Sequence, residues 1–172
     1  MNKSLYVLLT VFPLLVSACF ADDARPIKWG AMTNSALMSA NLKGGNTEIK
    51  YGEPLVLSIM IKNISTNETF DGEYMYLDDH DLSFVVISPS GKNISPVFKH
   101  GPTGFYSGPS GGFNVFPNQT SEIQFYLSNI CDFHKIGTYK ITAKQRLHAN
   151  PGKKEFVVVS DTLTVSVIPS DQ

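Results

Sequence analysis

The stretch that decides the fold is Leu55-Val56-Leu57-Ser58-Ile59-Met60-Ile61-Lys62, followed by the polar residues Asn63-Ile64-Ser65-Thr66-Asn67. Its first residue and every second one after it form a purely aliphatic series. A period of two is typical of a β-strand that buries one face. The stretch therefore predicts a half-buried strand that ends in a polar turn.

Short patterns of the same kind recur along the chain and are separated by residues that favour turns. We expect further strands at residues 35–42, 70–77, 82–87, 94–98, 123–127, 137–143, 156–159 and 163–167. Ser160-Asp161, between the last two, predicts a bulge or a kink between sheets. No amphipathic helical window of useful length occurs. The pattern predicts an all-β, antiparallel sandwich of seven to nine strands over residues 32–169.

Three segments resemble bacterial immunoglobulin-like domains: residues 52–63, 84–92 and 136–141. The resemblance implies an immunoglobulin-like sandwich in which Tyr139 forms a tyrosine corner, its hydroxyl hydrogen-bonded to upstream backbone. Ile141 stands where an antibody domain has its second cysteine. The resemblance thus implies a core without the disulfide that joins the two sheets.

The order of these segments, over roughly residues 50–145, is also similar to that of proteinase-inhibitor domains of the BsuPI type. That similarity implies peptidase inhibition as one function to consider. Its motifs are structural, and none of them is a reactive site.

The N-terminus has the plan of a secretion signal over residues 1–21. Lys3 supplies a basic start, and residues 5–16 form an apolar run that is too short to span a membrane. We therefore expect an exported protein. Residues 22–31 would form a tether or an edge segment before the sandwich.

The end of this signal can be interpreted in two ways. Val16-Ser17-Ala18-Cys19 resembles a bacterial lipobox, in which Cys19 becomes the lipidated first residue of the mature chain. Ordinary cleavage after Ala18 or Ala21 would instead release a soluble chain. The first alternative implies a periplasm-facing lipoprotein of the outer membrane, and the second a soluble periplasmic or secreted protein. The lipid would be the sole membrane contact.

Composition excludes several classes of function. The chain of 172 residues is 42% hydrophobic and 17% charged, with a net charge of −1. It has no Lys/Arg run and no surplus of basic residues for phosphates, so nucleic-acid binding is disfavoured. It has two cysteines, Cys19 and Cys131, which do not make a disulfide framework.

Residues 99–120 interrupt the strand pattern with many glycines, several prolines and four aromatic residues. A long segment of this composition in a compact domain is often functional. We expect it to carry a binding surface for a protein or peptide partner, or alternatively to fold its aromatic rings back over the sandwich. The candidate binding residues are Phe105, Tyr106, Phe113 and Phe116.

No group of residues indicates catalysis or a cofactor. Asp78-Asp79-His80-Asp81 is the densest set of potential metal ligands. It lacks a calcium-loop spacing, and we interpret it as a solvated turn. Cys131 and His134 lie three residues apart without any flanking signature of a nucleophile, so a buried structural cysteine is the simpler interpretation.

Two further features have structural interpretations. Trp29, the only tryptophan, is predicted to close one end of the core. Asn63, Asn67, Asn93 and Asn118 each begin an Asn-x-Ser/Thr triplet, a glycan acceptor in eukaryotic secreted proteins. The lipobox-like signal points to a bacterium, where we interpret them as turn residues.

Together these features predict a non-enzymatic binding module of the cell envelope. A peptidase inhibitor is the first alternative, and a structural accessory subunit of an envelope complex is the second. The oligomeric state is left open.

Overall fold

The computed structural model describes residues 26–73, 81–94, 112–152 and 154–170. Within these residues the chain forms eleven strands and one short 3₁₀ helix, η1 (Leu127–Asn129). The strands are β1 (Ala36–Leu42), β2 (Glu48–Lys50), β3 (Val56–Asn63), β4 (Thr69–Glu73), β5 (Leu82–Ile87), β6 (Asn93–Ile94), β7 (Gly112–Val115), β8 (Thr120–Tyr126), β9 (Gly137–Asn150), β10 (Lys154–Val159) and β11 (Leu163–Ile168).

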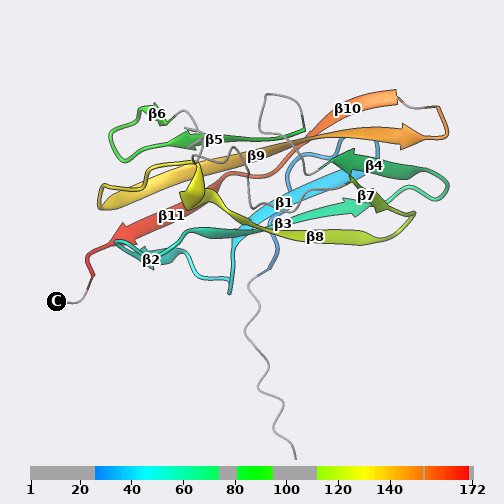
Figure 1. The fold of residues 1–172 in the computed structure, drawn as a ribbon. Coiled ribbons are helices and arrows are strands. Elements are labelled where there is room, and N and C mark those ends of the chain that lie inside the picture. The colour runs from blue at the N-terminus through cyan, green and yellow to red at the C-terminus, as the bar shows by residue number, and fades with distance from the viewer. Residues whose placement is uncertain (1–25, 74–80, 95–111, 153, 171–172) are drawn as a thin grey trace, which may run out of the picture.

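The strands form two sheets that pack face to face (Figure 1). The smaller sheet has the order β1-β3-β8, with both pairs antiparallel. The larger sheet has eight strands built around β9. The prediction of an all-β sandwich is confirmed, with eleven strands in place of seven to nine.

Strand β9 is the axis of the larger sheet because it pairs with two strands along each of its edges. β10 and β11 pair with one edge, and β4 and β5 pair with the other. β7 extends the sheet beyond β4, and β6 extends it beyond β5. β2 pairs in parallel with β11, while every other pair of named strands is antiparallel.

The predicted irregularity at Ser160-Asp161 is a β-bulge. Val159 lies opposite Lys144, and Leu163 lies opposite Ile141. Three residues of one strand therefore face two residues of β9, which is the extra residue that defines a bulge. β10 and β11 are in effect one long strand, bent at this point.

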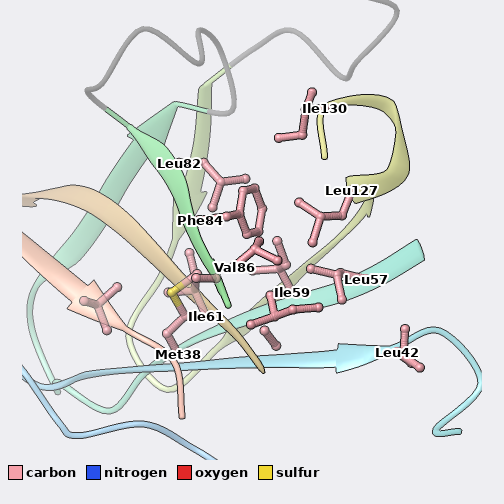
Figure 2. Close-up of a cluster of buried hydrophobic side chains, with 14 of the residues drawn as sticks. Met38, Leu42, Leu57, Ile59, Ile61, Leu82, Phe84, Val86, Leu127 and Ile130 are labelled. Carbon is pink, nitrogen blue, oxygen red and sulfur yellow. The ribbon is translucent and has the colours of Figure 1, made fainter. Parts of the chain in front are cut away.

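The core fills the space between the sheets with aliphatic and aromatic side chains. Figure 2 shows the inward residues of β3, Leu57, Ile59 and Ile61, facing Phe84 and Val86 of β5. The aliphatic residues of β3 that the alternation predicted to be buried therefore do face the core. At one end of the sandwich the chain after β8 adds Leu127 and Ile130, which are also buried.

Tyr139 makes the hydrogen bonds that the resemblance implies. Its hydroxyl donates to the Lys135 carbonyl at 2.9 Å and accepts from the Lys135 N–H at 3.1 Å. The side chain is 1% exposed, and its ring lies edge-on to Phe133 at 5.0 Å. These contacts fix the entry to β9 on the segment that precedes it.

The described part of the N-terminal segment packs against the sandwich. Gly30 N–H donates to the Met38 carbonyl at 2.8 Å. A Cβ at Gly30 would lie 2.0 Å from the Val159 carbonyl oxygen, so only glycine fits between β1 and the bulge. Trp29 is half-buried and is not a member of the buried core. That Trp29 closes one end of the core therefore remains a prediction.

Candidate functional site

The structure describes two of the four aromatic residues predicted to bind a partner. Phe105 and Tyr106 lie outside the described residues. Phe113 packs against the core, and its ring covers Gly72, where a Cβ would lie 2.4 Å from the ring. It takes the alternative role of covering the sandwich. Phe116 is 51% exposed and is the member of the set that a partner could contact.

Phe116 belongs to a group of three turns that meet at one end of the sandwich, here called the turn cluster. It comprises residues 32–35, 64–68 and 116–119. Ile64 N–H donates to the Ser35 carbonyl, and Asn63 N–H donates to the Gln119 carbonyl, each at 2.9 Å. The last two turns precede β4 and β8 at the right-hand end of Figure 1.

Each turn of the cluster presents one large apolar side chain to solvent. These are Met32 at 63% exposure, Ile64 at 38% and Phe116 at 51%. Glu68 is the only charged residue in the three turns. A nearly uncharged surface that exposes three large apolar side chains suits a protein or peptide partner better than a polyanion.

A buried amide holds the turn cluster together. The Asn63 side chain is 0% exposed. Its Nδ2 donates to the Glu68 carbonyl at 2.7 Å and to the Val115 carbonyl at 2.9 Å, while its Oδ1 accepts from Ser65 N–H at 2.9 Å. Because Asn63 ends β3 and Val115 ends β7, this one side chain connects the smaller sheet to the larger one.

The backbone of the cluster adopts unusual conformations. Asn34, Ser35 and Asn118 have φ angles of +46°, +61° and +61°. Residues other than glycine seldom adopt positive φ, and those that do are concentrated at functional positions. Among residues other than glycine, asparagine tolerates a positive φ best, which explains Asn34 and Asn118.

The predicted metal ligands do not form a described site. Asp78, Asp79 and His80 lie outside the described residues. The carbonyl of Asp81 accepts from Arg146 N–H at 2.7 Å, which fixes the start of β5 on β9. Among the residues that the structure describes, no group of three or more His, Cys, Asp or Glu side chains could hold a metal ion.

Asp71, near the turn cluster, is held by two amides. Asn150 Nδ2 donates to its Oδ2. The Asn114 amide, with its nitrogen turned toward Asp71, donates to Oδ1 at 2.7 Å. Both carboxylate oxygens therefore hydrogen-bond across β7, β4 and the end of β9. We interpret Asp71 as a structural residue of this sheet edge.

Cys131 and His134 are not arranged as a nucleophile and its base. Cys131 is buried, and burial raises the pKa of its thiol to about 11. The thiol is then protonated at neutral pH and is a poor nucleophile. The His134 imidazole is exposed and pairs with Asp132.

The opposite end of the sandwich has a shallow depression of about 250 Å³ beside β2. Its lining includes Lys43, Glu48 and Glu53, so both signs of charge are present. The Glu53 carboxylate accepts from Lys50 N–H at 2.9 Å and closes the local turn. The rest of its lining is apolar apart from Asn46, so the depression offers no single chemistry to a ligand.

Sequence reasoning missed Met32, Ile64 and the role of Asn63. A signal for Asn63 was present, because it continues the inward series of Leu57, Ile59 and Ile61 at the same period of two. An asparagine on the buried side of a strand needs hydrogen-bond partners. Met32 and Ile64 carry no local signal, since only the fold brings their turns beside Phe116.

Comparison with known proteins identified no relative of this chain. No protein-family model matches the chain, and a search of curated proteins found no match. The fold places the chain among the all-β sandwiches, a class that carries many unrelated functions. No helix in the described ranges is long and apolar enough to cross a membrane.

Proposed function

We propose that this protein is an exported, non-enzymatic binding module that holds a protein or peptide partner against the turn cluster. The observation that carries the proposal is the set of three exposed apolar side chains, Met32, Ile64 and Phe116, on three adjoining turns. Turns at the end of a rigid sandwich are where such domains usually carry binding sites.

The turns are well suited to recognition because they are rigid. Asn63 fixes two of them through three hydrogen bonds of its buried amide. A preorganised surface loses little conformational entropy on binding. A large aromatic side chain such as Phe116 then provides contact area at a low cost in side-chain freedom.

The place of action that we propose is the cell envelope. Support comes from the signal-like N-terminus and from Cys19 in its lipobox-like context. If Cys19 is the lipidated residue, the chain from Cys19 to Pro26 could reach at most roughly 25 Å, at about 3.5 Å per residue. The sandwich would then act close to the membrane surface, where its partner would also lie.

The proposal predicts that polar substitutions in the turn cluster abolish partner capture. We expect tagged wild-type protein to retain specific proteins from native envelopes, and the variant Met32→Ser/Ile64→Ser/Phe116→Ser to lose them. The matched control is Val157→Ser on β10, which replaces an equally exposed aliphatic residue away from the turn cluster. Equal capture by all three proteins would contradict the proposal.

The identity of the captured protein would separate the alternatives. A peptidase whose activity falls on binding would make the chain an inhibitor, as the BsuPI-type similarity implies. A component of a stable envelope assembly would make it an accessory subunit. Both outcomes keep the turn cluster as the contact surface if the triple variant fails to bind.

A further inference from the structure

Strand β8 is an edge of the smaller sheet, and one side of its backbone has no partner in the described part of the chain. The terminal hydrogen bonds of its pairing with β3 join Asn63 to Gln119 and Leu127 to Leu55. Odd-numbered residues of β8 therefore bond to β3, because hydrogen-bonded pairs alternate along an antiparallel ladder. The N–H and C=O groups of Thr120, Glu122, Gln124 and Tyr126 point away from β3.

This edge lacks the features that usually block strand addition. Among the described strands, β2, β6 and β7 are short edges of the larger sheet, and β10, which pairs only with β9, carries two charges, Lys154 and Glu155. The outer edge of β1 is occupied by Gly30 and by a bridge to Ser160. β8 is seven residues long, has no proline, lysine or bulge, and contains one charge, Glu122. Proteins protect such edges or use them for pairing.

The inward side chains of β8 are also incompletely covered. Ile123 and Phe125 pack against the core but remain half-buried, whereas their counterparts on β3, Ile59 and Leu57, are buried. Phe125 lies 4.9 Å from Phe84 of the opposite sheet, between ring centroids. A further strand beside β8 would cover this open margin of the core.

We propose that β8 pairs antiparallel with β8 of a second copy of this chain, about a twofold axis at Ile123. In that register Thr120 faces Tyr126 of the other copy, Glu122 faces Gln124, and the two Ile123 residues face each other. The outward-pointing groups of the even-numbered residues then meet as hydrogen-bonded pairs, which gives about eight backbone hydrogen bonds. In this register every residue of β8 is paired with a residue of the other copy.

The register centred on Ile123 uses all seven residues of β8 and brings no like charges together. A shift that centred the pair on Glu122 would place two carboxylates opposite each other, which is unfavourable. The Ile123 register instead places each carboxylate opposite an amide and joins the aliphatic residues on the core side. Because β8 complements itself along its full length, a second copy is the partner that the sequence of the strand favours.

The register is tested by charge variants at position 124, which is exposed. Gln124→Glu would place like charges at two symmetric positions and should weaken dimerisation about fivefold or more. Gln124→Lys would create two opposite-charge pairs and should strengthen it by a similar factor. Sedimentation of the protein expressed from the full sequence gives the dissociation constants. If both variants shift the constant in the same direction, the register is wrong.

A cross-link provides a second test that does not depend on small energies. Ile123→Cys places the two sulfurs on either side of the twofold axis, at a pair spacing of about 4.5 Å between Cα atoms, within the range of disulfides. We expect a covalent dimer on mild oxidation. The matched control, Thr120→Cys, lies far from its own copy in this register and should stay monomeric.

Two results would overturn the proposal. One is wild-type protein that sediments as a monomer up to about 1 mM, a range that includes weak contacts. The other is a strand from a different protein bound at β8, which would assign the edge to that partner. Neither result bears on the turn cluster, so the proposed function would be judged separately.

Discussion

Asn63→Ala should lower the free energy of unfolding by about 3 kcal/mol. The substitution leaves the Val115 carbonyl and the Ser65 N–H without the side-chain partner that each now has, while the Glu68 carbonyl keeps only the Ser65 Oγ donor at 2.9 Å. An unsatisfied buried polar group costs about 1–3 kcal/mol, and relaxation of the turns would recover part of the total. Urea unfolding followed by circular dichroism measures the change.

Asn67→Ala is the matched control for this substitution. It removes the same side chain from the same turn at an exposed position, so its effect should stay within about 0.5 kcal/mol. If Asn63→Ala cost no more than this control, Asn63 would not be the residue that joins the two sheets at the turn cluster. Both variants also bear on binding, since we expect partner capture to weaken in Asn63→Ala alone.

Tyr139→Phe should cost about 2 kcal/mol. The ring keeps its place against Phe133, while the hydroxyl that bonds both the N–H and the carbonyl of Lys135 is lost. A neutral hydrogen bond contributes about 1 kcal/mol, and the buried ring prevents water from replacing it readily. Thermal and urea unfolding give the change in stability.

Tyr126→Phe serves as the control because the Tyr126 side chain is 49% exposed on β8. Loss of that hydroxyl should have almost no effect on stability. Equal costs for the two tyrosines would show that the corner at Tyr139 is not a stabilising contact of the fold.

Much of the fold follows from local patterns in the sequence. The period of two in residues 55–61 identifies the buried face of β3, and the same logic applies to Tyr139, Ile141 and Ala143 in β9. The turn at residues 88–92 closes as expected, with Gly91 at a φ of +78°. These features depend on neighbours in the chain, so a single sequence contains the information.

Other features depend on contacts between distant segments. β9 extends seven residues beyond its predicted end at Ala143, because strands far away in sequence pair with both of its edges. The choice between the bulge and the kink predicted at Ser160-Asp161 required the strand register on both of its sides. Strand length and pairing are decided by tertiary partners, which local propensity does not contain.

The candidate site shows the same division. Phe113 and the buried Val115 are two residues apart in β7 and therefore lie on the same face of the strand, so the alternation indicates that Phe113 is covered. Phe116 follows the strand and lies in the turn. The long aromatic-rich segment therefore contained two different kinds of residue. Met32 and Ile64 lie more than 50 residues from Phe116 in the sequence, and only the fold brings their turns together.

The most direct test of the turn cluster is a photo-cross-link from Phe116 in native cells. A benzoylphenylalanine at position 116 should join the chain to its partner, because the Phe116 side chain is 51% exposed on the turn cluster. The same residue at Lys140, exposed on the outer face of β9, should give no such adduct. An adduct from position 140 with none from position 116 would contradict the account.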